Sequence, residues 1–513
     1  MLPYYLSIPL GLVTAALCYP FLMRYFLYYQ LSAYRLKELK TAVSRRGSLD
    51  PARAALLSVA CFVGMFICTY GGKAGSWGVF SYLLFPASAA LEYGLYKKGN
   101  KVKLKYTARF KRLLALFFLF TGLFCVLLAL PASAALPAVS LLGLSPLTAA
   151  PLGFLAAHGI SSLFENARNQ AFIDRAAATL KDRKDVLKIG ITGSAGKTTA
   201  KNVLTAMLSQ KYRVTATEGN YNTPMGIALT VNNRLKREDR VFVAEMGARY
   251  IGDIYDLCRI VRPCYGFYTN IGLQHAETFG GAAAVREAKY ELAQNLMPGG
   301  AAFFNGDNKG CRELYQRFQG KKYRYGKDPD NDARYKNVAM SEQGTAFDLI
   351  LAGQAVRIQT PLLGEFIPAT VTGCALLAHT LGISAEQIKR AAAALKPIAH
   401  RLQLLYNGTD VIIDDAYNGN AEGASAALRV LGGFSGRIKV IVTPGLVELG
   451  AAQRAANRSL GREIAGRCDH MIVLGPNADD LIAGAKSAGC QEARIHLVKR
   501  VEEAGAVLAA ISG

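Results

Sequence analysis

The stretch Val186–Lys201, which reads VLKIGITGSAGKTTAK, constrains the fold more than any other part of the chain. An apolar run ends in a Gly-rich segment, and a helix-compatible pattern follows at once. This is the strand–loop–helix setting of a phosphate-binding loop. Gly193 and Gly196 let the backbone approach a phosphate closely, and the amides of Ser194–Thr198 can form an anion nest at a helix N-terminus. The stretch therefore predicts a nucleotide-binding α/β domain.

The side chains of this loop have separate expected roles. Lys197 can reach the β- and γ-phosphates of a nucleotide, and the Thr198 hydroxyl can hold Mg²⁺. Ile191 stands where the commonest form of the loop has its first Gly. A Gly-rich turn before an ordinary helix is the alternative, and the preceding strand together with Gly-Lys-Thr-Thr argues against it. The residues expected to bind the nucleotide here are Gly193, Ser194, Ala195, Gly196, Lys197, Thr198 and Thr199.

The charge of the chain is concentrated near its N-terminus. The whole chain has a formal net charge of +23, and residues 1–160 hold 16 Lys and Arg against 3 Asp and Glu. Most of this excess lies in two short loops between apolar runs, which favours membrane orientation over nucleic-acid binding. Zinc-ligand spacing and aromatic–basic RNA-binding patterns are absent from the sequence. The ten Cys follow no spacing rule, which indicates free thiols in a reducing compartment.

Five apolar runs precede the phosphate loop, and each is close to the ~20 residues that span a bilayer as a helix. Because the loops at 27–53 and 96–112 are basic, we predict a five-helix membrane section over residues 1–160, with the N-terminus outside. The expected location is the inner (plasma) membrane, multi-pass, with the later domains in the cytoplasm and with membrane lipid as a partner. Residues 161–185 are predicted to form a polar linker. The apolar runs lie at about 4–26, 54–71, 76–95, 113–131 and 136–158.

Strand and helix patterns alternate over residues 186–400, which predicts a mostly parallel, doubly wound sheet. From about 321 to 360 the pattern changes to short strands, which we interpret as an antiparallel addition. Glu245 ends a strand and is placed to bind Mg²⁺, although a single acidic residue at the end of a strand usually lies on the protein surface. His275 follows another strand and can bind a metal or phosphate or lie on the surface. Asn305 and Asp307 form a polar turn at the carboxyl end of a strand, where ligands collect in open sheets.

A further unit is expected over residues 401–513. It opens with Arg401, and a strand then ends in Asp414 and Asp415 before an Asn-rich turn; a helix-capping pair is the alternative role for these two acids. Strands at 439–442, 471–474 and 495–498 alternate with helices, which predicts a small Rossmann-like domain.

Six motifs follow one another in chain order: Gly-Ser-Ala-Gly-Lys-Thr-Thr, Gly-Asn-Tyr-Asn-Thr-Pro, Glu245-Met-Gly, Asn-Ile-Gly-Leu-Gln-His275, Ala-Lys289-Tyr-Glu and Asn305-Gly-Asp307. In this order they resemble the motifs of the Mur ligases, most closely the D-alanyl-D-alanine-adding type. The resemblance covers about 186–500.

The resemblance implies roles that the residues alone do not. From the helix pattern alone, Lys289 is expected to be a solvated lysine on an amphipathic helix. The resemblance implies instead that Lys289 is carbamylated by CO₂ and binds Mg²⁺. It implies that Glu245 and His275 are ligands of two Mg²⁺ ions. It implies that Asn305 and Asp307 form a turn that binds adenosine, and that Arg401 is a hinge residue that reaches the ATP phosphates. Lys197, Lys289, His275 and Arg401 are then the expected catalytic residues. Asp415 would face the nucleotide, and the expected substrate contacts are Asn222, Thr223, Tyr417 and Asn418.

Three departures from the family pattern limit what carries over. The segment Leu363–Pro368 lacks the usual His-Asn pair, and the sequence ends at Gly513 where relatives usually add a final strand pair. The predicted membrane section also stands where the family has its UDP-sugar-binding domain. The identity of the acceptor is therefore open.

The implied reaction is ATP-dependent amide formation through an acyl phosphate. We expect a membrane-anchored ligase that joins an amino acid or dipeptide to a cell-envelope precursor. Whether that precursor is linked to a lipid is left open. The alternatives are a polyglutamate-type ligase for a capsule polymer and a non-catalytic ATP-binding scaffold that binds envelope-synthesis proteins. The set Lys197, Thr198, Glu245, His275 and Lys289 argues against the scaffold, and the short C-terminus argues for it.

Overall fold

The computed structural model of the chain forms two compact units, Met1–Gln170 and Ala171–Gly513. The structure describes residues 104–129, 146–272, 281–397, 399–408, 410–416, 421–434, 436–447, 449 and 452–512, with residues 23, 26–31, 34 and 36 near the N-terminus.

In the first unit, the structure describes helix α5 (Ala108–Ala129) and the beginning of α7 (Pro146–Asp182). Phe110 and Phe117 of α5 pack edge-to-face against Phe26 at ring-centroid distances of 5.5 and 5.4 Å. Arg112 of α5 donates to the buried Glu165 carboxylate of α7 at 2.5 Å. The ion pair therefore joins α5 to α7, and the aromatic contacts join α5 to Phe26.

The prediction of a multi-span membrane section, and of a multi-pass membrane location with it, is contradicted. None of the helices that the structure describes has both the length and the apolar composition needed to cross a bilayer. The expected run 136–158 enters α7, which continues for 37 residues into polar sequence. The expected spans at 54–71 and 76–95, and nearly all of 4–26, lie outside the described residues.

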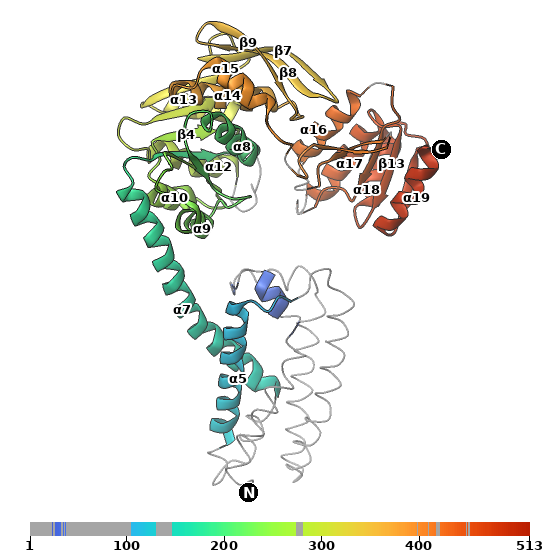
Figure 1. Cartoon of the computed structure of the whole chain (residues 1–513). Helices are drawn as coiled ribbons and strands as arrows, with labels where there is room; N and C mark the ends of the chain where they lie inside the picture. Colours follow the sequence, from blue (N-terminus) through green and yellow to red (C-terminus); the bar gives the residue numbers. More distant parts are fainter. Residues whose placement is uncertain are drawn as a thin grey trace. The chain divides into compact units, whose positions relative to one another are not determined.

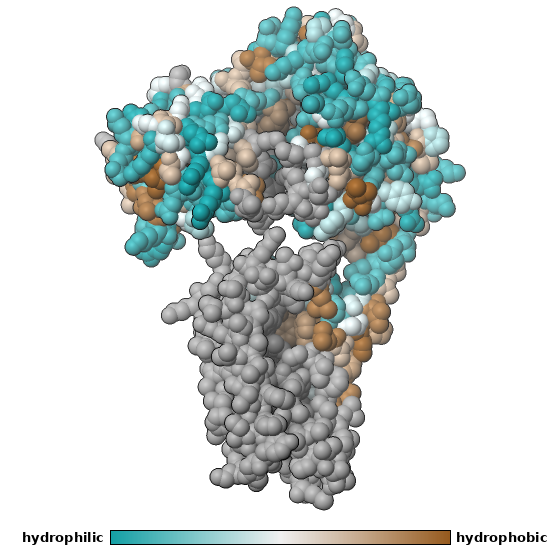
Figure 2. Space-filling model, turned by 180° about the vertical axis from the view of Figure 1, so that it is seen from behind, coloured by the Kyte–Doolittle hydropathy of each residue, from teal (hydrophilic) through white to brown (hydrophobic). Residues whose placement is uncertain are grey.

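The physical reason for this error is that an apolar run predicts burial without saying what buries it. Phe110, Leu113 and Phe117 of α5 are almost fully buried against other side chains of the unit. Other apolar side chains of these helices face outward, as for Leu119 and Phe164, and Figure 2 shows hydrophobic residues on the described surface of this unit.

The second unit contains a nine-stranded sheet of order β2-β3-β1-β4-β5-β6-β7-β8-β9. Figure 1 labels β4, β7, β8 and β9 of this sheet. Neighbouring strands from β2 to β7 are parallel, which confirms the predicted doubly wound α/β class for this part. The strands are β1 (Leu187–Thr192), β2 (Val214–Ala216), β3 (Val241–Glu245), β4 (Tyr265–Tyr268), β5 (Ala301–Asn305), β6 (Lys321–Gly326), β7 (Ala333–Ser341), β8 (Gly344–Leu351) and β9 (Gln354–Thr360).

Helices cover both faces of this sheet, because side chains alternate between two buried clusters along each strand. Ile189, Val243 and Phe303 face α8, α14 and α15, whereas Phe242 and Phe304 face the end of α7 with α9, α10, α12 and α13. The helices are α8 (Lys197–Leu208), α9 (Pro224–Arg234), α10 (Asp253–Val261), α12 (Ala282–Gln294), α13 (Lys309–Arg317), α14 (Ile367–Thr380) and α15 (Ala385–Ala393).

The antiparallel addition is smaller than predicted. β6 pairs in parallel with β5 and β7 pairs in parallel with β6, so only the β7–β8 and β8–β9 pairs are antiparallel. Tyr325, on β6, is fully buried and stacks on Phe267 at 5.3 Å, which places β6 in the core rather than on an edge.

The C-terminal part contains an antiparallel hairpin and a three-stranded parallel sheet of order β12-β13-β14. The three strands fall where the sequence predicts them, and helices alternate with them in the Rossmann-like manner. The elements are β10 (Gln403–Asn407), β11 (Asp410–Asp414), α16 (Ala421–Gly432), β12 (Val440–Thr443), α17 (Gln453–Ala465), β13 (His470–Leu474), α18 (Ala478–Ser487), β14 (Ile495–Val498) and α19 (Val501–Ser512).

Candidate active site

The phosphate loop runs from the carboxyl end of β1 into the first turn of α8. Gly196 caps α8 in the left-handed conformation, with φ 77°, which a residue without a Cβ adopts at little cost. At Gly193 a Cβ would lie 1.9 Å from Oγ1 of Thr269, so only glycine fits there. Both glycines that the sequence singled out are therefore required by the backbone path and by close packing.

Residues after β4 brace this loop, and the sequence reasoning gave them no role. Asn270 accepts the Ala195 amide on its Oδ1 at 2.7 Å and the Ser194 amide on its backbone oxygen at 2.9 Å. The Thr269 hydroxyl donates to the Ala195 carbonyl at 2.6 Å. The signal available in the sequence was an Asn directly after a buried strand, which is a typical place for a loop-bracing amide.

Two lysines bring positive charge to the loop. Lys197 donates from Nζ to the Gly193 carbonyl at 2.8 Å and to the Ser194 carbonyl at 3.3 Å. Lys289 of α12 is 3% exposed and has no hydrogen bond or ion pair with any residue that the structure describes. Burial, together with the positive charge of Lys197, lowers the pKa of Lys289 to about 7. The interpretation of Lys289 as a solvated surface lysine, which rested on the helix pattern alone, is therefore wrong.

Glu245 lies at the end of β3 and bonds the loop helix. Its Oε2 accepts the Thr198 hydroxyl at 2.9 Å and lies 3.3 Å from Lys201 Nζ, while its Oε1 accepts the Asn222 amide at 3.2 Å. Thr198 and Glu245, both predicted Mg²⁺ ligands, are thus brought together.

The donor set at Thr198 and Glu245 fits one Mg²⁺ ion. A carboxylate has about four acceptor positions, and three are used here, so one remains on Oε1 of Glu245. Mg²⁺ commonly takes one or two carboxylates, with waters and substrate phosphates completing its shell. Within the part of the chain that the structure describes, His, Cys, Asp and Glu form no cluster of three. The protein itself would therefore supply few ligands.

The predicted nucleoside turn lies at the end of β5, two strands from the phosphate loop. Asn305 donates to the Thr269 carbonyl at 2.7 Å and accepts the Asp307 amide at 3.0 Å. Asp307 accepts the Tyr335 hydroxyl at 2.8 Å and the Lys327 amide at 2.8 Å. These bonds connect the turn to the phosphate loop on one side and to β6 and β7 on the other.

The hinge segment places Arg401 beside the phosphate loop. His400 and Leu402 have φ values of 60° and 47°, so left-handed backbone flanks Arg401 on both sides. Arg401 donates to Thr198 Oγ1 at 3.5 Å, and Asp415 accepts the Leu402 amide at 3.2 Å. Burial raises the pKa of the Asp415 carboxyl.

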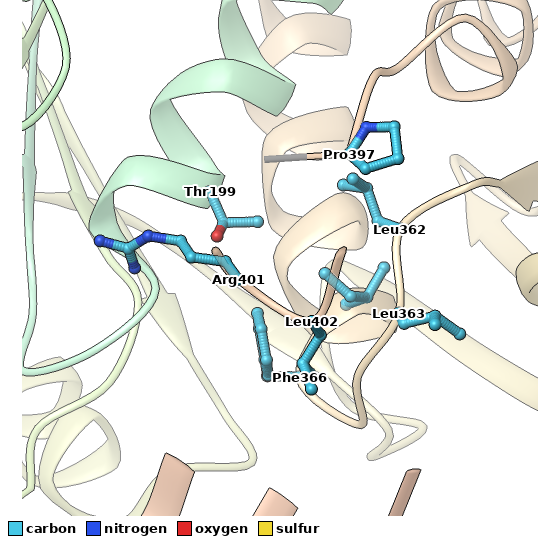
Figure 3. Close-up of a pocket in the computed structure, with 8 residues that line it drawn as sticks. Thr199, Leu362, Leu363, Phe366, Pro397, Arg401 and Leu402 are labelled. Atoms are coloured by element: carbon cyan, nitrogen blue, oxygen red, sulfur yellow. The ribbon is translucent and has the colours of Figure 1, made fainter. Parts of the chain in front are cut away.

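An apolar pocket lies next to this contact (Figure 3). In the view, the Arg401 side chain extends from the hinge past Thr199, while Leu363, Phe366 and Leu402 gather on the other side. The segment that lacks the His-Asn pair thus packs against the hinge. The pocket is lined by Thr199, Leu362, Leu363, Phe366, Ile367, Pro397, Arg401 and Leu402.

The remaining predicted residues have varied outcomes. Thr223 is the N-cap of α9 and accepts the Gly226 amide at 3.3 Å. His275, Tyr417 and Asn418 lie outside the described residues. Lys201, which the sequence reasoning passed over, contacts Glu245 directly; its signal was its position four residues after Lys197, on the same face of α8.

The lowered pKa of Lys289 predicts a pH dependence of stability. Between pH ~7 and ~10.5 the unfolded chain binds a proton at this lysine that the folded chain does not, so stability rises with pH across that window. In CO₂-free buffer we expect the melting temperature of the wild type to increase relative to Lys289→Met from pH 7 to pH 9.5. A constant difference between the two proteins would contradict the assignment.

A parallel sheet covered on both faces, with a phosphate loop at its centre and buried cations around it, defines a P-loop nucleotide-binding enzyme domain. Comparison with known proteins specifies the family. The description "Mur ligase middle domain" matches residues 191–377, and "Mur ligase, glutamate ligase domain" matches residues 400–512. The UDP-N-acetylmuramoyl-tripeptide–D-alanyl-D-alanine ligase of Escherichia coli K12 is 31% identical over 58% of this chain and 67% of that protein.

Solved structures show the same likeness. MurF from Acinetobacter baumannii superposes with a TM-score of 0.61 and 26% identity, covering 67% of this chain and 74% of that one. MurF from Thermotoga maritima in complex with ADP superposes with a TM-score of 0.57 and 25% identity, covering 64% of this chain and 74% of that one.

The chain belongs to the Mur ligase family, whose members are ATP-dependent, ADP-forming ligases that make amide bonds. It spans about two thirds of the length of the curated relatives that it matches.

Proposed function

We propose that this protein is an ATP-dependent carboxylate–amine ligase of the MurF type, which joins D-alanyl-D-alanine to the peptide of a UDP-N-acetylmuramoyl-tripeptide. The observation that carries the proposal is the pair of cations at the phosphate loop, where Lys197 lies over the loop and Arg401 reaches Thr198, the partner of the Glu245 carboxylate. Such an excess of positive charge beside a phosphate loop favours a triphosphate and a carboxylate at once. The names of the relatives support this choice of substrates.

The reaction has two steps. The acceptor carboxylate attacks the γ-phosphorus of ATP, and ADP leaves, which forms an acyl phosphate. The amine of the dipeptide then attacks the acyl carbon, phosphate leaves, and the ammonium proton is lost as the amide forms. Lys197 offsets negative charge that develops on the transferred phosphoryl group, and Arg401 adds charge from the hinge. Positioning two charged substrates together is the other main contribution of the site.

Mg²⁺ bound by Thr198 and Glu245 would supply further charge neutralisation at the phosphates. Lys289 is a candidate second carboxylate-like ligand, because a lysine with a pKa of about 7 is about half uncharged amine at neutral pH, whereas an ordinary lysine is almost entirely ammonium. An uncharged amine reacts with CO₂ to give a carbamate anion. Its burial without a partner among the described residues supports this role. His275 remains a proposed ligand of a second ion.

Each region of the sequence has its own proposed role. Residues 186–400 would bind ATP and Mg²⁺, and residues 401–513 would bring Arg401 and Asp415 to the nucleotide. Asn222 and Thr223 would lie near the acceptor, and Tyr417 and Asn418 near the nucleotide or the amine. Residues 1–160 carry no proposed catalytic role, and residues 161–185 connect them to the ATP-binding region.

The test is a ligation assay with the full chain, ATP, Mg²⁺ and bicarbonate, in which products are identified by mass spectrometry. UDP-N-acetylmuramoyl-tripeptide is offered with D-alanyl-D-alanine, and in parallel with glutamate or a single D-alanine. We expect one amide product that requires both the acceptor and D-alanyl-D-alanine. Product with glutamate alone would replace the proposed amine, and ATP binding without any product would favour the scaffold.

A further inference from the structure

Lys201 is one of the most deeply buried charged side chains near the phosphate loop. It lies one turn after Lys197 on α8 and is 2% exposed. Its Nζ lies 3.3 Å from Oε2 of Glu245, which is also 2% exposed, and donates to the Gly219 carbonyl at 2.5 Å. Because the side chain is enclosed and its ammonium is bonded to these protein groups, Lys201 does not line the surface that a nucleotide would contact.

The segment that Lys201 bonds is the loop after β2. Gly219 has a φ of 47°, a left-handed conformation, and its carbonyl receives the ammonium. Two further residues of this loop meet the same strand end: Thr217 Oγ1 accepts the Glu245 amide at 3.0 Å, and Asn222 donates to Glu245 Oε1 at 3.2 Å. Three side-chain bonds and one ion pair therefore connect the loop 217–222, the backbone amide and carboxylate of Glu245, and the phosphate-loop helix.

The sheet order places this loop on the side of the site away from the nucleoside turn. In the order β2-β3-β1-β4-β5, the phosphate loop follows the central β1, and Asn305 follows β5, two strands away in one direction. The loop 217–222 follows β2, two strands away in the other direction. A nucleotide that extends from β5 to β1 thus leaves the β2–β3 edge for the second substrate, since ligands lie across the carboxyl ends of the strands.

We propose that Lys201 is a positioning residue that fixes the loop 217–222 against Glu245 and so shapes the acceptor side of the site. The inference rests on the proposed function for the identity of the acceptor. A neutral side chain of similar length would free the Gly219 carbonyl and remove the only described ammonium that pairs with Glu245. The loop would then sample several positions, while the backbone that cradles the phosphates, braced by Asn270, would keep its own bonds.

The first experiment measures hydrogen exchange by mass spectrometry in the full chain, which needs no substrate. We compare the wild type with Lys201→Met, with Lys201→Gln, which keeps a donor without the charge, and with Lys211→Met as a control on an exposed lysine after α8. We expect faster exchange of the amides of residues 218–223 in Lys201→Met, a smaller increase in Lys201→Gln and none in the control. Unchanged exchange in Lys201→Met overturns the proposal.

The second experiment separates the two substrates kinetically. With UDP-N-acetylmuramoyl-tripeptide as acceptor, we expect Lys201→Met to raise the acceptor KM about 10- to 100-fold, as for loss of bonds to a charged group, and to change the Kd of ATP by less than about threefold. Equal effects on both substrates overturn the proposal. If Lys201→Met does not fold, Gly219→Val strains only the loop and leaves the Lys201–Glu245 pair in place; it is expected to raise the acceptor KM alone.

These outcomes distinguish the inference from the function on which it rests. A wild type that gives no ligation product refutes the proposed acceptor, while the exchange experiment still decides whether Lys201 holds the loop. A wild type that is active, with a Lys201→Met variant whose exchange and acceptor KM are both unchanged, keeps the function and refutes the inference.

Discussion

Replacing Lys197 by Ala is expected to lower the rate of ATP-dependent ligation by about 10²- to 10³-fold, the cost of removing one preorganised charge from a transition state. Lys197 is the first residue of α8, and its ammonium is held over the phosphate loop by the Gly193 and Ser194 carbonyls. Burial lowers the pKa of Lys197, and the nearby carboxylate of Glu245 opposes that shift. The measurement is the rate of product formation at saturating substrates.

Two controls make the Lys197 result specific. Lys236→Ala removes an exposed lysine in the same unit and should leave the rate unchanged. The melting temperature of Lys197→Ala should stay close to that of the wild type, because the bonds of this lysine to the described residues go to two carbonyls of its own loop. A folded Lys197→Ala protein with near wild-type ligation would mean that the phosphate loop does not bind the reacting phosphates.

The second large effect is expected at Lys289. If its amine carries a carbamate, Lys289→Ala and Lys289→Arg should both lose about a hundredfold or more in ligation rate, since neither side chain can supply the anion. Arginine is the informative variant because it keeps the positive charge. If the ammonium were the functional form, Lys289→Arg would retain much more activity than Lys289→Ala.

Carbamylation can also be observed directly. After incubation with ¹³C-bicarbonate, the wild type should give a carbamate carbon signal that is absent from Lys289→Ala. Because the uncharged amine is the reactive form, the signal should grow as pH rises through about 7, the pKa to which burial lowers Lys289. Ligation that neither depends on bicarbonate nor accompanies such a signal would exclude this role for Lys289.

Much of the ATP-binding region could be predicted because its signals are local. The step from an apolar strand to Gly-Lys-Thr-Thr predicts a loop that needs glycines. In the structure Gly196 is required by its left-handed backbone, and Gly193 by its close contact with Thr269. Glu245 could be placed near Thr198 because two parallel strands end at the same edge of the sheet. Alternating strands and helices gave the α/β class for the same reason.

The incorrect predictions concern segments whose structure depends on the groups that surround them in the fold. The run that became part of α5 is apolar whether it packs on aromatic neighbours or faces lipid, and the sequence does not contain that distinction. Strand β6 was assigned to an antiparallel addition because short strands surround it, whereas burial of Tyr325 between sheet and helix keeps it in the parallel part. Lys289 looked like a surface lysine because periodicity does not report which helix face the sheet covers.

The site residues that sequence reasoning missed act at long range. Lys201, Thr217 and Asn270 are far apart in the chain or unremarkable in composition, and their roles follow from partners that only the fold supplies. A buried lysine facing a glutamate 44 positions away cannot be paired from one sequence.

The central claim is that the acceptor carboxylate is activated by phosphoryl transfer, and isotope transfer tests it most directly. UDP-N-acetylmuramoyl-tripeptide labelled with ¹⁸O in its reacting carboxylate is incubated with the full chain, ATP, Mg²⁺, bicarbonate and D-alanyl-D-alanine, and the released phosphate is analysed by mass spectrometry. The acyl-phosphate route predicts one ¹⁸O atom in each phosphate released with product. Amide formation that releases phosphate without ¹⁸O would contradict the account, because the carboxylate oxygen would then never have been bonded to phosphorus.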